Sequence, residues 1–167
     1  SMLYLENISL NGPVKIDSVK LGEDGTFDFQ ENAMDSITPE FYRLRIANQT
    51  INLSIDSTET VTVKAAYPQM SYKYEVEGSE NCNTIKELSL KQMLLQSNIN
   101  GIVKNPNIGV DSVDVIVARM LNDYKQDIKR NYIFKAPMMA SSYYALFQTI
   151  QLGNSNSLIF NPRNNKE

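Results

Sequence analysis

The sequence predicts an α+β fold, with an N-terminal antiparallel β meander or sandwich of about six to seven strands followed by about three α-helices. Two patterns support this prediction. Before Gly78, apolar and polar side chains alternate with period two between short turns, which is typical of antiparallel strands with one solvated side. After Gly78, apolar residues recur every three to four positions, which is typical of amphipathic helices.

The first strands are expected near the start of the chain, one beginning at Leu3 and one over residues 14–21. In the second strand, the residues expected to face inward are Val14 and Ile16 in its first half and Val19 and Leu21 in its second half. The two pairs are out of step with a strict two-residue alternation. A β-bulge at residues 17–18 would account for that change. The Asp-Gly pair within Gly22–Gly25 then predicts a hairpin turn to a strand over residues 27–29.

Further strands are predicted over residues 41–46, 51–55, 61–65 and 72–76. Their core-facing residues are expected to be Tyr42, Leu44, Ile46, Ile51, Leu53, Ile55, Val61, Val63, Ala65, Tyr72, Tyr74 and Val76. Because strand side chains alternate between faces, Arg43 and Arg45 are expected on the opposite, solvated side.

The predicted helices follow in the second half. Ser79 is a candidate N-cap for the first helix, which ends before a loop over residues 101–109. The second begins at Asp111 or Ser112 and has the clearest apolar stripe of the chain. A last helix is predicted over residues 139–150.

The same patterns suggest how the chain is organised. We expect a β part over residues 1–78 and a helical part of the same domain over 79–152. Gly153 occupies the position where helices commonly stop. The remaining residues, 153–167, are rich in Asn and Ser, which is typical of a linker or tail.

Composition excludes several classes of function. The chain has no His, no Trp and one Cys, so it cannot form a Ser-His-Asp triad, a histidine metal site, an internal disulfide or a CxxC pair. The net charge of −3 without a basic stripe argues against nucleic-acid binding, and no apolar run is long enough to span a membrane. We therefore expect no catalytic, cofactor-binding or metal-ligating residue in this chain.

Cys82 is the one candidate for thiol chemistry. It lies where the first helix is predicted to start, and a helix N-terminus lowers the pKa of a thiol, which would favour a reactive role. The alternative is a small residue packed under the first helical turn. The second interpretation is preferred, because the nearest basic residue in sequence is Lys86.

Two groups of carboxylates have both a chemical and a plain interpretation. Glu75 and Glu77 share one face of a strand at a spacing that suits glycoside hydrolysis, but alternating polar residues are normally a solvated face. Asp24, Gly25 and Asp28 resemble part of a calcium loop, but the distal Glu of such a loop is missing and a hairpin turn explains them better.

Tyr and Met are enriched at protein interfaces, and both cluster before residue 145. Tyr143 and Phe147 are four positions apart, which favours a place in the core. Met138 and Tyr144 fall off that stripe and are the preferred interface candidates.

Several landmarks together resemble a known family. They are Tyr4–Glu6, Ile16–Val19, Asp24–Phe29, Phe41–Leu44, Glu77–Ser79, Ala136–Pro137, Ser141–Ser142 and Asn161–Asn165. The arrangement resembles the uncharacterised domain that precedes the thioredoxin-like domain in cell-envelope thiol:disulfide oxidoreductases of Gram-negative gut bacteria. The resemblance implies that residues 153–167 lead to a thioredoxin-like domain, which carries the redox CxxC. It also implies a place in the cell envelope, often with a lipoprotein anchor.

This chain departs from the family pattern at its start, because a further strand with a Gly normally precedes Leu3. Loss of that strand would leave its neighbour as an open edge, through which a homodimer could form. The leading hypothesis is a non-catalytic accessory domain that positions the redox domain or contacts client proteins. The alternative is a free-standing surface lipoprotein module that binds a glycan, peptide or protein.

Overall fold

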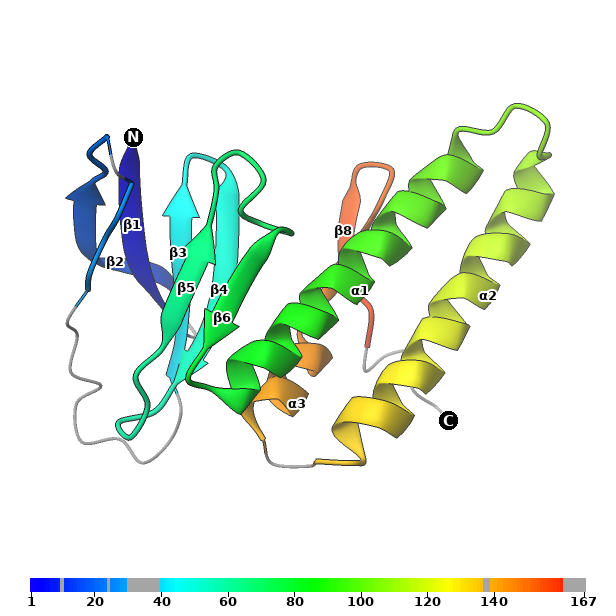
Figure 1. Cartoon of the computed structure of the whole chain (residues 1–167). Coiled ribbons are helices and arrows are strands. Elements are labelled where there is room, and N and C mark those ends of the chain that lie inside the picture. The colour runs from blue at the N-terminus through cyan, green and yellow to red at the C-terminus, as the bar shows by residue number, and fades with distance from the viewer. Residues whose placement is uncertain (10, 24, 30–39, 137–138, 161–167) are drawn as a thin grey trace. The chain divides into compact units, whose positions relative to one another are not determined.

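The computed structural model describes residues 1–9, 11–23, 25–29, 40–136 and 139–160, and Figure 1 shows the chain. The N-terminal strands precede the helices and the sheets are antiparallel, so the predicted α+β class is confirmed. The chain forms two compact units, residues 1–86 and 87–167, and the division falls within helix α1 (Glu80–Val103). Within the described residues, no helix has the length and apolar character needed to cross a membrane.

The first unit contains a four-stranded antiparallel sheet with the order β2-β1-β3-β4. Its strands are β1 (Met2–Ser9), β2 (Gly12–Lys20), β3 (Glu40–Ile46) and β4 (Gln49–Ile55). The predicted bulge is confirmed beside Asp17: Leu5 pairs with Asp17 and Glu6 with Lys15, which leaves Ile16 as the extra residue of β2. Val14 and Ile16 are exposed rather than inward, because β2 lies at the edge of the sheet.

A second, two-stranded sheet packs against the core face of the first and completes a small β-sandwich (Figure 1). It consists of β5 (Thr62–Ala65) and β6 (Tyr74–Glu77). The core side chains between the sheets include Leu44, Ile51 and Val76. Most of the predicted inward residues therefore lie where alternation places them, because each strand buries one face.

Two strand predictions were wrong. Phe27 and Phe29 pack against the sandwich core with their ring centroids 5.8 Å apart, but their segment pairs with no described strand. Tyr72 lies in the turn before β6 and is 50% exposed. Phe27 and Phe29 therefore contribute to the core without a strand ladder, whereas Tyr72 precedes the paired residues of β6.

The junction of β6 and α1 requires a glycine. Gly78 has a φ of +100°, and a Cβ there would lie 1.9 Å from the backbone oxygen of Thr60. Ser79 follows, and its hydroxyl oxygen accepts a hydrogen bond from the backbone N–H of Cys82 at 3.2 Å. The predicted N-cap at Ser79 is therefore confirmed.

The second unit is built from the remainder of α1, α2 (Val110–Ile128), a single π-helical turn η1 (Lys129–Ile133) and α3 (Ala140–Leu146). The predicted second helix starts within two residues of the observed one. Its buried residues Val117, Tyr124 and Ile128 lie on one stripe and pack with Leu88 and Ile99 of α1.

The prediction of a helix to Ile150, followed by a tail from Gly153, was wrong. Helix α3 ends at Leu146, and β7 (Thr149–Leu152) and β8 (Ser155–Leu158) form an antiparallel hairpin. Gly153 and Asn154 make its two-residue turn, a sequence typical of tight hairpins. Ile159 and Phe160 then join the core of this unit.

Side chains of α1 fix the hairpin in place. Gln92 donates a hydrogen bond from Nε2 to the backbone oxygen of Thr149 at 2.9 Å. The amide of Gln96 donates to the backbone oxygen of Gln151 at 2.9 Å and accepts from the backbone N–H of Gln151 at 2.8 Å. These bonds satisfy backbone groups along the β7 edge that would otherwise lack a partner strand.

Candidate functional site

Cys82 lies in the first turn of α1 and is completely buried. Its Sγ donates to the backbone oxygen of Ser54 at 3.3 Å. Burial raises the pKa of the thiol, and this effect outweighs the hydrogen bonds with Ser79 and Ser54, which act in the opposite direction. Cys82 therefore packs as a neutral side chain, as the preferred interpretation expected, and the helix N-terminus does not activate it.

The two sets of acidic residues lie as their structural interpretations predict, one on a solvated strand face and one beside a turn. Glu75 and Glu77 both lie on the exposed face of β6, opposite Lys64 and Thr62 of β5. Asp24 lies outside the described residues, but the N–H of Gly25 donates to the backbone oxygen of Gly22 at 3.2 Å, which closes a turn. In the part of the chain that the structure describes, no group of three or more acidic or cysteine side chains could hold a metal ion.

The aromatic predictions around α3 need correction. Tyr143 and Phe147 are 44% and 68% exposed, so the expectation that they are core residues was wrong. Tyr144 instead packs against the core of the second unit, and its hydroxyl lies 2.8 Å from that of Ser89. The helix is rotated relative to the prediction because it is short and leads directly into β7. An interface role for Tyr144 stays a prediction, and Met138 lies outside the described residues.

A charged cluster on the solvated face of the large sheet was not predicted. Glu6 accepts hydrogen bonds from Nη2 of Arg43 at 3.0 Å and from Nε of Arg45 at 2.7 Å. Burial of Glu6 opposes ionisation, but the hydrogen bonds and charges of Arg43 and Arg45 outweigh it and lower the pKa of the carboxyl. Lys15 and Arg45 also lie over the ring of Tyr4, at 4.9 and 4.7 Å from its centre.

Sequence reasoning placed Arg43 and Arg45 on the correct face but not their partner. Glu6 pairs with Arg43 across β1 and β3, a register that only the folded sheet defines. The outward-facing arginines were the signal that the sequence offered. The sequence did not show which carboxylate on a neighbouring strand would pair with them. Both oxygens of Glu6 accept hydrogen bonds from the arginines, and Arg45 also donates to the backbone oxygen of Ala47 at 3.1 Å, so the cluster links β1 to β3.

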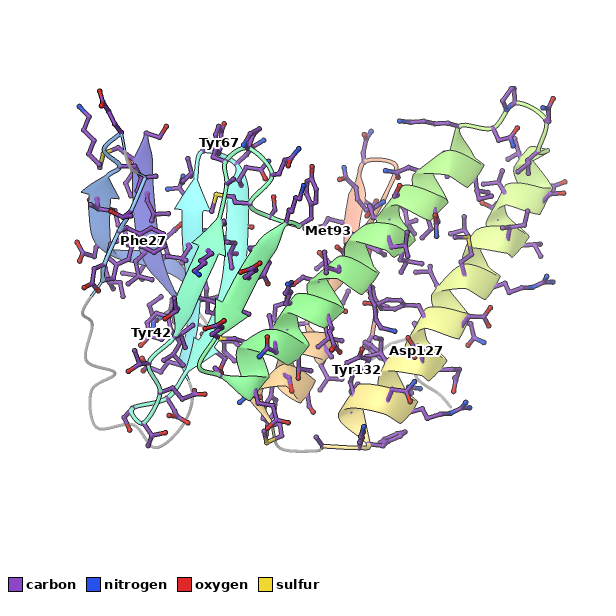
Figure 2. The ribbon with its side chains drawn as sticks, in the orientation of Figure 1. Phe27, Tyr42, Tyr67, Met93, Asp127 and Tyr132 are labelled. Carbon is purple, nitrogen blue, oxygen red and sulfur yellow. The ribbon has the colours of Figure 1, made fainter. Side chains whose placement is uncertain are left out.

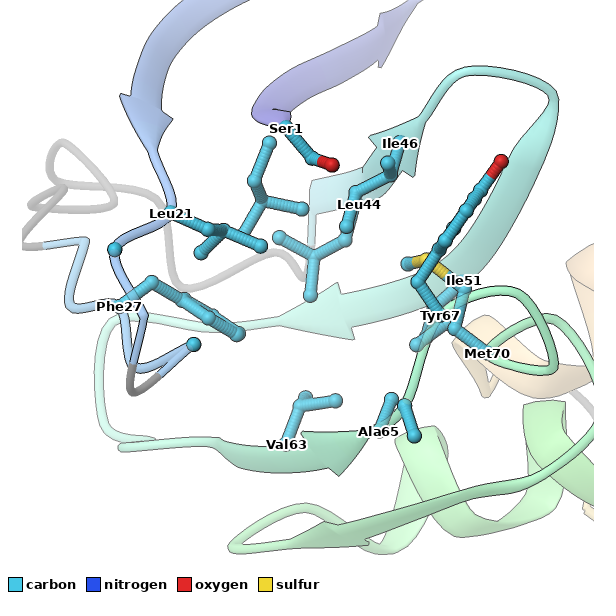
Figure 3. Close-up of a pocket in the computed structure, with 14 residues that line it drawn as sticks. Ser1, Leu21, Phe27, Leu44, Ile46, Ile51, Val63, Ala65, Tyr67 and Met70 are labelled. Carbon is cyan, nitrogen blue, oxygen red and sulfur yellow. The ribbon is translucent and has the colours of Figure 1, made fainter.

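A concave feature lies inside the sandwich, at the end where β1 begins and β5 finishes (Figure 3). We call it the sandwich cavity; it has a volume of about 300 Å³. Its lining residues are Ser1, Leu3, Leu21, Gly22, Gly25, Phe27, Leu44, Ile46, Ile51, Val63, Ala65, Ala66, Tyr67 and Met70. Ala65 and Tyr67 among them are exposed, so the cavity reaches the surface.

A second cavity of about 270 Å³, with largely apolar lining side chains, lies along the same interface between the sheets. Phe27, Leu44 and Val63 line both cavities and separate one from the other. Among the described residues that line the second cavity, Asp28 and Tyr42 have ionisable side chains. The sandwich therefore offers apolar volume but few groups that could perform acid–base or nucleophilic chemistry.

Comparison with known proteins adds no relative: no family model, no curated protein and no solved structure matches the chain.

Proposed function

We propose that this chain is a non-catalytic accessory domain of a cell-envelope, thioredoxin-like thiol:disulfide oxidoreductase. It would position the redox domain or contact client proteins. The sulfurs that exchange disulfides would belong to a CxxC on the neighbouring thioredoxin-like domain, because exchange requires an accessible thiolate and a second thiol to resolve the mixed disulfide.

The observation that carries this proposal is the state of Cys82. The one thiol of the chain is fully buried and donates a hydrogen bond to Ser54, and burial raises its pKa. A thiol in this state is a poor nucleophile, because the thiolate is the reacting species. The assignment to the envelope and to a thioredoxin-like protein rests on the resemblance in the turn and strand motifs.

A second candidate is a free-standing binding module at the cell surface, and the sandwich cavity favours it. Glycan sites present converging polar groups, whereas most of the described side chains that line this cavity are apolar. The cavity therefore suits a peptide or protein partner of such a module better than a glycan.

A thiol–disulfide exchange assay tests the non-catalytic role. The chain and its Cys82→Ser variant are each mixed with oxidised glutathione, and their turnover is compared with that of equimolar free cysteine. We expect both proteins to remain at or below the rate of free cysteine. Turnover well above that rate, lost in Cys82→Ser, would contradict the proposal.

The coding sequence downstream of Glu167 distinguishes the two candidates. A reading frame that continues into a thioredoxin-like sequence with a CxxC supports the accessory domain. A stop codon directly after Glu167 contradicts it and favours the free-standing module.

A further inference from the structure

We propose that the sandwich cavity is a binding site for a neutral aromatic group of one or two rings. The inference goes beyond the accessory role and does not depend on it, because it concerns only residues of the first unit. It rests on the volume, the charge and the side-chain chemistry of the cavity.

The volume fits a group of this size. The sandwich cavity measures about 300 Å³, whereas an engineered apolar cavity of roughly 150 Å³ binds benzene. A two-ring group such as indole therefore fits where one benzene ring would leave space. The cavity also opens to solvent beside Ala65 and Tyr67, so a ligand can enter without unfolding the sandwich.

The charge of the lining selects a neutral ligand. None of the described residues that line the cavity has a side chain that is charged at neutral pH. A carboxylate or phosphate in this space would lose its hydration, and no lining side chain would supply a counter-charge, which is strongly unfavourable. The one cation among the described lining residues is the α-amino group of Ser1, which is exposed, so the titrations use the N-terminally acetylated chain. The charged cluster of Glu6, Arg43 and Arg45 lies on the other face of the sheet, so it cannot supply one.

The side chains around the cavity favour an aromatic ring over an aliphatic chain. Figure 3 shows Phe27 and Tyr67 on opposite sides of it, with Val63 on one wall and Leu44 on the other. Phe27 and Tyr67 can make edge-to-face contacts with a ring between them. Met70 adds a polarisable thioether at the same site, and sulfur–aromatic contacts are favourable.

Ala65 provides the test position. It lies in β5, lines the cavity and is exposed, so Ala65→Phe places a ring at the cavity mouth. Aromatic residues are favoured in strands, so this variant is expected to fold. Ala118→Phe, at an exposed position of α2 in the second unit, is the matched control.

The experiment titrates the acetylated native chain with indole and follows backbone amide chemical shifts. We expect saturable shifts confined to the lining residues, at least a tenfold loss of affinity in Ala65→Phe, and no change in Ala118→Phe. Indole-3-carboxylate is expected to bind at least tenfold more weakly than indole. The proposal is overturned if indole gives no saturable shifts, if Ala65→Phe binds as the native chain does, or if the carboxylate binds equally well.

A further arm identifies where the ring comes from. The blocked peptide acetyl-Gly-Gly-Trp-Gly-Gly-amide presents the same indole within a polypeptide. Tighter binding of the peptide than of free indole supports the site and assigns its ligand to a protein side chain. Weaker binding of the peptide, with indole still bound, supports the site and assigns it to a free aromatic compound. Failure of either ligand to bind leaves the exchange assay on Cys82 unaffected, so the two proposals fail independently.

Discussion

The two units of this chain place their polar groups in opposite ways. In the first unit the interior is apolar and hollow, and the charged cluster of Glu6, Arg43 and Arg45 lies on the outer face of the sheet. In the second unit a polar chain runs through the core: Tyr124 donates to Oε1 of Gln148 at 2.5 Å, and Gln148 donates to the backbone oxygen of Leu88 at 2.9 Å.

The first unit can therefore accept a ligand, whereas the second unit is stabilised by hydrogen bonds within its core. Apolar walls without internal hydrogen bonds can admit another apolar group at little cost. A buried polar chain fixes the relative positions of the helices and the hairpin, because each of its members would be costly to leave unpaired. Figure 2 labels Phe27 and Tyr67, two of the side chains that line the cavity of the first unit.

Core truncations should give the largest contrast. Ile128 has no exposed surface, so Ile128→Ala is expected to lower the free energy of unfolding by about 3–4 kcal/mol through lost burial and a new cavity. Val63 lines a cavity that already exists, so Val63→Ala should cost less than about 1 kcal/mol. Urea denaturation measures the free energy of unfolding of both variants. Equal losses in Ile128→Ala and Val63→Ala would contradict the difference between the two cores.

Two glycine substitutions should have opposite signs. Gly78→Ala is expected to cost about 2–3 kcal/mol, because its φ is positive and the new methyl group would meet the backbone of Thr60. Gly101 lies in α1, and a methyl group added there would meet no neighbouring side chain or strand within 4 Å, so Gly101→Ala should stabilise by roughly 0.5–1 kcal/mol. Thermal denaturation of both variants checks this, and a neutral Gly78→Ala would show that the junction is not constrained.

Removing one hydroxyl from the polar chain of the second unit should have an intermediate effect. Tyr124→Phe leaves the buried Oε1 of Gln148 without its donor, and we expect a loss of about 1–2 kcal/mol. The matched control is Tyr72→Phe at an exposed turn, which should change stability by less than about 0.5 kcal/mol. Equal losses of stability in Tyr124→Phe and Tyr72→Phe, measured by urea denaturation, would contradict the stabilising role of the buried polar chain.

The charged cluster should make stability depend on acid pH. The pKa of Glu6 is lower in the folded chain than in the unfolded chain, so its contribution is present above about pH 4.5 and is lost as pH falls through the folded pKa. Glu6→Gln should cost about 1 kcal/mol at pH 7, because Arg43 and Arg45 remain partly solvated. The loss should shrink toward pH 3; a loss that is constant with pH would contradict the role assigned to the carboxylate.

The ion pair on the second unit should matter least. Lys91 Nζ lies 2.8 Å from Oδ2 of Asp127, and both side chains are about a third or more exposed. Lys91→Met is therefore expected to cost no more than about 0.5 kcal/mol and to lose most of that effect in 1 M salt. Urea denaturation at low and high salt measures it, and a loss above about 1 kcal/mol would show that this pair is a structural anchor.

The strands of the sandwich could be predicted because alternation reports burial on one face of a sheet. The bulge beside Asp17 and the N-cap at Ser79 could be predicted as well, since both have local sequence signals. The hairpin of β7 and β8 was missed because Gly153 suits a helix end as well as a tight turn. Its partner Asn154 was the signal that distinguishes the two.

The candidate site could not be predicted in the same way. Cys82 was correctly interpreted as a packed residue from its place in the first helical turn, but its contact with Ser54 depends on tertiary packing. The sandwich cavity depends on how Phe27, β3 and the segment from β5 to Tyr67 pack around it, and these parts are separated in sequence. The pairing of Glu6 with two arginines likewise depends on strand register. Both are properties of tertiary packing, which no local pattern encodes.

The burial of the one thiol is the claim on which the non-catalytic role depends, and its labelling rate tests it most directly. Native chain and chain unfolded in urea are reacted with a thiol-specific disulfide reagent at the same pH, and the two rates are compared after correction for urea. Native Cys82 is expected to react at least about 100-fold more slowly, because labelling requires the start of α1 to open. Labelling of the native chain at close to the unfolded rate would contradict it.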